Sequence, residues 1–296
     1  MAFVATLVAN PSNPVLTPAL AEKAAEAVNA SGLYWLADGI ACDIALRDGS
    51  DPDEAGDKIR AVIGDALIDL AVQNAETRRK KLLIADMDST MIGQECIDEL
   101  AAEVGLKDKV ATITARAMNG EIAFEPALRE RVALLKGLPI SVVDEVIEKR
   151  ITLTPGGREL IATMKAKGYY TALVSGGFTV FTSRIAATLG FDENRANILL
   201  DVDGKLTGEV AEPILGKQAK VDALNDIATR LGITPDEAMA VGDGANDLGM
   251  LHLSGAGVAL HAKPAVAAEA KIRIDHGDLT ALLYLQGYRK SDFVTG

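Results

Sequence analysis

The sequence predicts an α/β fold in which helices cover both faces of a parallel sheet, preceded by a smaller α+β domain. Helix and strand patterns alternate from Thr154 onward, as they do where helices cross over between parallel strands. Residues 93–150 are dense in helix formers and directly follow the apolar strand 82–85. This position indicates a helical insertion above the carboxyl ends of the strands, where ligands bind in such folds.

The first elements follow from their start and turn signals. A strand over 3–9 is followed by a helix with Thr17 as N-cap and Pro18 at its first position, which we expect to end near Gly32. Two extended runs then flank Asp38-Gly39, which is the pattern of a β-hairpin.

A second helix and a last strand complete this domain. Asp51 as N-cap and Pro52 after it predict a helix to about Ala66, and residues 68–72 are apolar enough for a strand. The order β-α-β-β-α-β resembles the ferredoxin-like arrangement of ACT domains, which sense small molecules, although many unrelated modules share it.

A basic run, Arg78-Arg79-Lys80-Lys81, separates this part from the strand 82–85 and is typical of a solvated linker. We therefore expect an ACT-like domain over 1–77 and a second domain over 78–296, whose helical insertion spans about 93–152. The elements expected around that insertion are the strand 82–85, a helix after Pro155, a strand over 170–174, a helix from about Thr179, a hairpin about Asp203-Gly204, a helix from Lys220 and a strand over 238–241. Together they predict a Rossmann-like three-layer sandwich.

Composition narrows the classes of function. The 296 residues are 49% hydrophobic and 24% charged, as in an ordinary globular protein. The net charge of −12 repels phosphate backbones and anionic lipids, and only 4% of the residues are aromatic, so neither nucleic acid nor a membrane is expected as a partner. Cys42 and Cys96 form no disulfide framework, and residues 1–4 do not begin a leader segment, so we expect a cytoplasmic protein.

Acidic residues cluster where two predicted strands end. The strand 82–85 runs into Asp86-Met87-Asp88-Ser89-Thr90, and the strand 238–241 runs into Gly242-Asp243-Gly244-Ala245-Asn246-Asp247. A third strand ends in Ser175-Gly176-Gly177. Four carboxylates in one crevice repel one another unless a cation is bound or some stay protonated. Oxygen ligands without His or Cys point to Mg²⁺ as that cation.

The same parts suit phosphoryl transfer. A cation, a hydroxyl, the N–H groups of glycine turns and Lys220 could hold a phosphoryl group and neutralise its charge. No Ser-His-Asp arrangement is recognisable, so an aspartate is the natural nucleophile.

These motifs resemble the signature of the haloacid dehalogenase superfamily, and residues 82 to about 276 resemble its phosphoserine phosphatases. The resemblance implies that Asp86 is the nucleophile and that Asp88 protonates the leaving seryl oxygen and later activates water. It also implies Mg²⁺ bound by the carboxylates of Asp86 and Asp243 and by the carbonyl of Asp88, with Asp247 acting through water or orienting Lys220.

Substrate contacts follow from the same resemblance, because phosphoserine carries an ammonium and a carboxylate beside its phosphate. The residues implied are Ser175, Gly176, Lys220 and Asn246 for the phosphate, Glu95 for the ammonium, Arg131 for the carboxylate, and Met118 and Phe124 for closing over the substrate. The reaction implied is hydrolysis of O-phospho-L-serine, the last step of L-serine synthesis.

Two alternatives stay open. The same chemistry could act on another small phosphate ester, or the chain could be a sensor whose first domain binds an amino acid and whose phosphatase activity is secondary. Against the sensor, residues 10–14 lack the glycine expected where a backbone approaches a ligand. The first domain could instead serve a homodimer.

Overall fold

The computed structural model describes residues 2–118 and 121–295, and the chain divides into two compact units. The first unit comprises Met1–Lys81, Pro155–Tyr169 and Lys271–Gly296, and the second comprises Leu82–Thr154 and Tyr170–Ala270. Two segments that follow residue 154 thus lie in the same unit as the first 81 residues. The division into domains over 1–77 and 78–296 stays a prediction.

The first unit contains an antiparallel sheet of order β2-β3-β1-β4. Its elements are β1 (Phe3–Ala9), α1 (Pro18–Ala27), β2 (Gly32–Ala37), β3 (Ala41–Ala45), α2 (Pro52–Ile63), β4 (Ile68–Asn74), α7 (Gly157–Ala166), β12 (Ile272–Ile274), α12 (Ala281–Leu285) and the helical turn η3 (Lys290–Asp292). The predicted ferredoxin-like order of the first six is confirmed, and their likeness to ACT domains stays a prediction.

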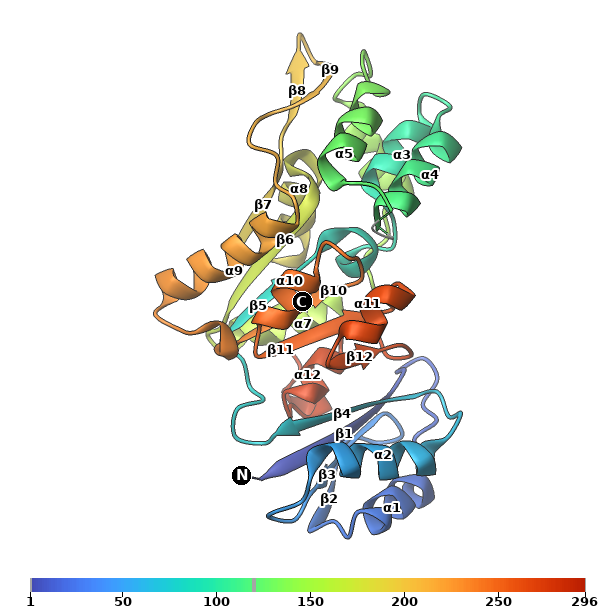
Figure 1. The fold of residues 1–296 in the computed structure, drawn as a ribbon, viewed down its shortest axis with the longest axis vertical. Helices are drawn as coiled ribbons and strands as arrows, with labels where there is room; N and C mark the ends of the chain where they lie inside the picture. Colours follow the sequence, from blue (N-terminus) through green and yellow to red (C-terminus); the bar gives the residue numbers. More distant parts are fainter. Residues whose placement is uncertain (1, 119–120, 296) are drawn as a thin grey trace. The chain divides into compact units, whose positions relative to one another are not determined.

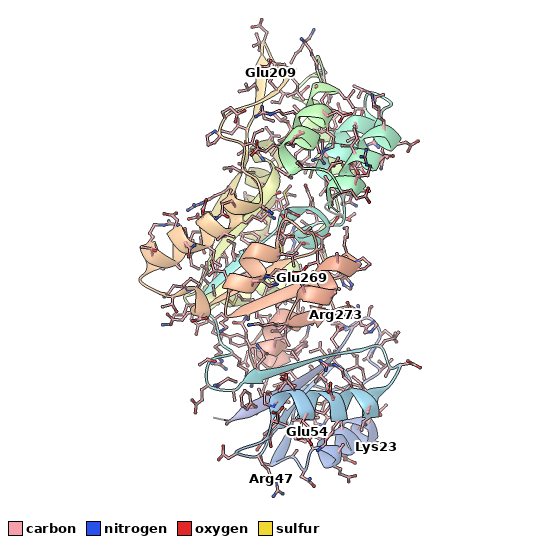
Figure 2. All side chains as sticks on the ribbon, viewed as in Figure 1. Lys23, Arg47, Glu54, Glu209, Glu269 and Arg273 are labelled. Carbon is pink, nitrogen blue, oxygen red and sulfur yellow. The ribbon has the colours of Figure 1, made fainter. Side chains whose placement is uncertain are left out.

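The helices α1 and α2 begin where their caps were predicted. The Thr17 side chain accepts the N–H of Leu20, and the Asp51 side chain accepts the N–H groups that follow it. Each helix buries a face of small and branched residues and exposes charged ones, among them Lys23 on α1 and Glu54 on α2 (Figure 2).

Both helices end earlier than predicted. The helix α1 stops at Ala27 because Asn29 has a φ of 47°, a left-handed conformation that breaks the helix. The helix α2 stops at Ile63 because Gly64 has a φ of 54°.

The later segments of the first unit pack on its sheet. The strand β12 contacts β4, and α12 contacts β1. The buried carboxylate of Asp69, on β4, accepts hydrogen bonds from the N–H groups of Asp275, His276 and Gly277 at 2.7–3.2 Å. The Asp43 carboxylate on β3 pairs with both terminal nitrogens of Arg78 at 2.7 and 3.0 Å. The bonds of Asp69 join segments about 200 residues apart, whereas Asp43 and Arg78 are 35 residues apart.

The second unit is an α/β sandwich with a helical insertion, as predicted (Figure 1). Its elements are β5 (Leu82–Ala85), the helical turn η1 (Met87–Met91), α3 (Cys96–Ala102), α4 (Lys107–Met118), α5 (Phe124–Ala133), α6 (Val142–Arg150), β6 (Tyr170–Phe178), α8 (Thr179–Leu189), β7 (Glu193–Asn197), β8 (Leu199–Val202), β9 (Lys205–Val210), α9 (Lys217–Leu231), the turn η2 (Pro235–Glu237), β10 (Ala238–Gly242), α10 (Leu248–Leu253), β11 (Ala256–Leu260) and α11 (Pro264–Glu269).

The strands β11-β10-β5-β6-β7 lie in that order, and every neighbouring pair is parallel. Leu82 and Ile84 of β5 pack with residues of α9 and α10, and Leu83, which points the other way, is also fully buried. Both faces of the sheet are therefore covered. Since the strands are parallel, their carboxyl ends meet at one edge.

The insertion forms a cap of four helices above this edge. In Figure 1 the helices α3, α4 and α5 lie together, and α3 also contacts α6. The β8–β9 hairpin contacts α5, and its turn is formed by Asp203 and Gly204 at φ 51° and 73°, as predicted for a two-residue hairpin turn. Among the described residues, no helix has both the length and the apolar character needed to cross a bilayer.

Two predicted boundaries in this unit were wrong. The helix α9 begins at Lys217, after Gly216 as N-cap, so Lys220 lies one turn inside the helix and does not open it. The strand β6 continues through Gly176 to Phe178 and does not end at Val174, because Phe178 still pairs with Asn197 of β7.

Candidate active site

Asp86 follows β5 directly and is buried at the carboxyl edge of the sheet. Its N–H donates to the carbonyl of Val241 on β10 at 3.0 Å, which fixes the backbone between the two strands. Its Oδ1 accepts the N–H of Met87 at 2.8 Å and lies 2.7 Å from Nζ of Lys220. Burial and the Asp247 carboxylate raise the pKa of Asp86 well above its usual value, and Lys220 opposes them.

The turn after Asp86 brings Asp88 back toward the same edge. Within η1, Asp88 and Ser89 both leave the helical conformation, and Ser89 has a φ of 55°, so the chain turns sharply there. Oδ1 of Asp88 is shielded from solvent and has no hydrogen-bond partner in the described part of the chain. Burial, and then the nearby Glu95, raise the pKa of Asp88 to about 8. A carboxyl group whose pKa is raised in this way can act as a proton donor near neutral pH.

Three acids come together beside these residues. Single carboxylate oxygens of Asp86, Asp243 and Asp247 all lie within 4.8 Å of one another. Nζ of Lys220 lies 2.6 Å from Oδ1 of Asp247, and Oδ2 of Asp247 accepts the N–H groups of Asp243 and Gly244. A buried set of oxygen donors without nitrogen or sulfur suits a hard divalent cation such as Mg²⁺.

Each carboxylate oxygen of Asp243 has a hydrogen-bonding partner. Oγ1 of Thr90 donates to Oδ1 at 3.2 Å, and Nζ of Lys263 lies 2.6 Å from Oδ2. Burial and the Asp247 carboxylate raise the pKa of Asp243 to about 6, against the effect of Lys263.

Gly242 leaves the space that Asp247 fills. A Cβ at Gly242 would lie 2.4 Å from Cγ of Asp247, and this side chain is fixed by Lys220 and by two backbone N–H groups. We expect Gly242→Ala to displace Asp247, to lower kcat at least about tenfold and to lower the free energy of unfolding by about 1–3 kcal/mol. Steady-state kinetics and denaturant titration measure the two effects.

The control for this prediction is Gly56→Ala in α2, where a Cβ would make ordinary contacts at 3.5 Å. It should leave kcat unchanged. If Gly242→Ala had the same kcat as the parent chain, a Cβ at Gly242 would not displace Asp247, and the prediction would be wrong.

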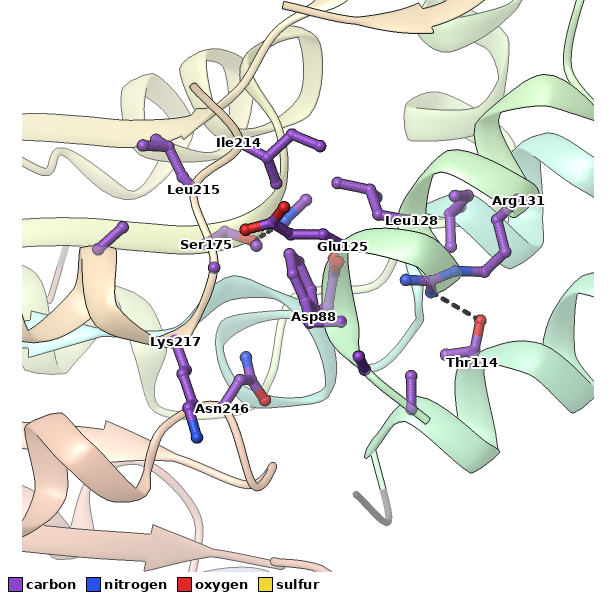
Figure 3. A pocket seen from close by; sticks show the side chains of 18 of the residues that line it. Asp88, Thr114, Glu125, Leu128, Arg131, Ser175, Ile214, Leu215, Lys217 and Asn246 are labelled. Atoms are coloured by element: carbon purple, nitrogen blue, oxygen red, sulfur yellow. Dashed lines mark hydrogen bonds between the residues drawn. The ribbon is translucent and has the colours of Figure 1, made fainter. Parts of the chain in front are cut away.

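A cavity of about 1000 Å³ lies between this edge and the cap (Figure 3). On the cap side, Arg131 of α5 is buried, donates from Nε to the carbonyl of Ala127 at 3.1 Å and from Nη1 to Oγ1 of Thr114 at 3.0 Å. Within the part of the chain that the structure describes, Arg131 has no ion-pair partner, and its hydrogen bonds go to Ala127 and Thr114. A buried guanidinium of this kind suits an anionic ligand.

Glu95 lines the same cavity at the start of α3. Its Oε1 accepts a hydrogen bond from Oγ of Ser89 at 2.6 Å, and burial raises the pKa of its carboxyl despite that bond. Positive charge on a ligand would be favoured beside it.

Two glycines near the end of β6 leave space for neighbouring side chains of the site. A Cβ at Gly176 would lie 3.0 Å from the ring of Phe124, and a Cβ at Gly177 would lie 3.0 Å from Oδ2 of Asp88. Oγ of Ser175 accepts the N–H of Gly177 at 2.8 Å, which orients the hydroxyl.

Most residues predicted for the site are thus brought together. Those that line the cavity are Asp86, Asp88, Glu95, Phe124, Arg131, Ser175, Gly176 and Asn246. Three further predicted residues lie next to Asp86 and do not line the cavity: Lys220, Asp243 and Asp247. Oδ1 of Asn246 is buried without a partner among the described residues. The side chain of Met118, at the end of α4, lies outside the described residues, and its predicted role stays a prediction, as do the other roles.

The sequence reasoning missed Thr90, Thr114 and Lys263. Lys263 follows β11, and the register pairs Ala259 of β11 with Gly242 of β10, so the two loops leave the sheet side by side. A lysine after a fourth strand end was therefore the available signal. Thr114 had no signal, because only the packing of α4 on α5 brings it to Arg131.

Comparison with known proteins agrees with this geometry. A family model described as haloacid dehalogenase-like hydrolase matches residues 83–252. A phosphoserine phosphatase of Polaromonas sp. is 44% identical over 224 residues, which cover 74% of this chain and 95% of that protein. One from Streptomyces coelicolor is 44% identical over 227 residues, but the match spans only 55% of its length. A solved haloacid dehalogenase family hydrolase from Salmonella enterica serovar Typhi has a TM-score of 0.84 and 30% identity, covering 96% of this chain and 98% of that one.

Proposed function

Because the chain belongs to the haloacid dehalogenase-like hydrolases, we propose that it is a phosphatase that hydrolyses O-phospho-L-serine to L-serine and phosphate, as the names of its relatives indicate. One observation carries the choice of substrate. A single cavity joins the acidic cluster around Asp86 to Arg131, a buried arginine without a carboxylate partner among the described residues, and to Glu95. Arg131 complements a carboxylate and Glu95 complements an ammonium, while Lys220 and a cation held by the acids around Asp86 would complement a phosphate on the same small molecule.

The proposed reaction has two steps. An oxygen of Asp86 forms a bond to phosphorus as the bond from phosphorus to the seryl oxygen breaks, and Asp88 gives its proton to that oxygen. Asp88, now a carboxylate, then takes a proton from water while the water oxygen bonds to phosphorus and the bond from phosphorus to the Asp86 oxygen breaks, which releases phosphate and restores the Asp86 carboxylate. The pKa of Asp88 of about 8 supports the donor role in the first step.

The other side chains of the site would position the substrate and neutralise its negative charge. Lys220, between Asp86 and Asp247, would balance charge on a phosphate oxygen and on the nucleophile. Ser175 and Asn246 line the cavity beside Asp88 and could donate to the remaining phosphate oxygens. Closure of the cap around Phe124 would exclude water.

The donor set fits a divalent cation. We propose Mg²⁺, held by the carboxylates of Asp86 and Asp243 and the carbonyl of Asp88, with Asp247 close enough to contribute an oxygen. When bound, it would neutralise charge that develops on the phosphoryl group.

The substrate assignment is tested with Arg131→Ala and two substrates. Phosphoethanolamine has the phosphate and ammonium of phosphoserine but no carboxylate. We expect Arg131→Ala to lower kcat/KM for phosphoserine about 100-fold, because a charge-assisted hydrogen bond is lost, and to change that for phosphoethanolamine less than about threefold. Arg116→Ala, which removes an exposed arginine of the cap, is the control and should change neither value. Equal losses on both substrates would contradict the assignment of Arg131 to the carboxylate.

We also propose a cytoplasmic enzyme of L-serine synthesis that acts as a homodimer. Cys42 and Cys96 are buried free thiols, as expected in a reducing compartment. Light scattering of the purified full chain would report its assembly state.

A further inference from the structure

Lys263 is attached to the acidic cluster in two ways. It is the residue before Pro264, at the start of α11, and its N–H donates to the carbonyl of Asp243 at 3.0 Å. Its Nζ lies 2.6 Å from Oδ2 of the same residue. The backbone contact fixes Lys263 beside the loop of Asp243, so the side chain needs little further ordering to reach the carboxylate.

The two lysines of the cluster differ in their surroundings. Lys220 is buried between Asp86 and Asp247 and touches both. The side chain of Lys263 is 34% exposed, whereas that of Asp243 is 1% exposed. Lys263 therefore has solvent into which it can turn, and Lys220 has none.

The charges show what Lys263 does to the cluster. When ionised, Asp86, Asp243 and Asp247 together with Lys220 carry a net charge of −2, and Lys263 reduces it to −1. A divalent cation would be attracted by the same carboxylates and repelled by the Lys263 ammonium a few ångströms away. The Lys263 ammonium carries its positive charge at neutral pH, as an ordinary lysine does.

We propose that Lys263 is a positioning residue whose ammonium competes with the divalent cation for Oδ2 of Asp243, and so sets the affinity of the site for that cation. This inference rests on the proposed metal-dependent function. When the cation binds, Lys263 leaves Asp243 and turns toward solvent. Without the cation, Lys263 stabilises the clustered acids.

The test compares Mg²⁺ binding in the parent chain and in Lys263→Gln by calorimetric titration after chelation and dialysis. Gln can still donate a hydrogen bond to Asp243, so the variant removes charge and retains a contact. We expect Kd for Mg²⁺ to fall about tenfold. We also expect the Tm of the chelated protein to fall, and the rise in Tm on adding Mg²⁺ to grow.

Two control variants separate the loss of charge beside Asp243 from a change in side-chain shape and from a change in the net charge of the protein. Lys263→Arg keeps the charge and should bind Mg²⁺ within about threefold of the parent affinity. Lys205→Gln removes an exposed lysine from β9 and changes the net charge equally, and it should leave Kd unchanged. Weaker or unaltered Mg²⁺ binding in Lys263→Gln overturns the proposal.

A measurement on the parent chain covers the case in which Lys263→Gln does not fold. Acetylation of individual lysines, followed by mass spectrometry, should show Lys263 reacting at least about threefold faster with Mg²⁺ than without it, relative to Lys205. An equal or slower rate overturns the proposal. If the parent binds no Mg²⁺, the proposed metal-dependent function fails as well; if it binds Mg²⁺ and Lys263→Gln has the parental Kd, this inference alone fails.

Discussion

Replacing Asp86 by Asn is expected to abolish phosphoserine hydrolysis, with a loss in kcat of at least about 10⁴-fold. The amide has the shape of the carboxyl group but cannot form the bond to phosphorus on which both steps depend. The fold should persist, because the Asn oxygen can still accept the N–H of Met87. Removing one negative charge from a crowded set of acids also reduces repulsion. Kinetics on phosphoserine and circular dichroism measure the two properties.

Asp192→Asn is the matched control for Asp86→Asn. Asp192 is an acid of the same unit that does not line the cavity. Its Oδ2 accepts hydrogen bonds from the N–H and the hydroxyl group of Thr171. It should retain kcat within about twofold. Ordinary turnover in Asp86→Asn would remove Asp86 from the role of nucleophile.

Asp88→Asn is expected to lower kcat about 10²- to 10⁴-fold and to change the pH dependence that remains. The first step needs protonated Asp88, whose pKa is about 8. In the parent, kcat/KM should therefore fall as pH rises through that pKa, because the donor loses its proton. A cation bound to the neighbouring acids would lower the pKa, so the midpoint of this fall is expected at or below about 8. In Asp88→Asn the fall should vanish.

Measuring kcat/KM for phosphoserine from pH 5 to 10, in a buffer of constant ionic strength, would show whether the fall occurs in the parent and is absent from Asp88→Asn. Phosphate esters with a leaving group of low pKa, such as p-nitrophenyl phosphate, need no proton donor in the first step and should lose less activity in Asp88→Asn than phosphoserine does. Equal losses, or a parental pH profile in the variant, would contradict the assignment.

The sequence could predict the chemistry of the site because that chemistry follows a local rule. Asp86, Asp88 and Asp243 each lie just after an apolar strand, and parallel strands bring their carboxyl ends to one edge. Ser175 follows the same rule, although its strand continues to Phe178.

What could not be predicted depends on contacts between distant segments. Lys263 reaches Asp243 across 20 residues, and Thr114 reaches Arg131 only through the packing of two cap helices. No local pattern reports that Gly242 must leave room for the side chain of Asp247, five residues later. The grouping of residues 155–169 and 271–296 with the first unit has the same cause, because it depends on contacts such as those of β12 with β4.

The hydrogen bonds of Asp69 to residues 275–277 bear on how this chain could have been assembled during evolution. A domain that is exchanged between genes as one continuous stretch must close its own core. Here a sheet built by the first 74 residues packs against β12 and α12, which are encoded near the other end of the same gene. A gene fusion or deletion that moved only one of these stretches would leave the Asp69 carboxylate buried without its donors. The two ends of the reading frame are therefore expected to be inherited, and to vary, together.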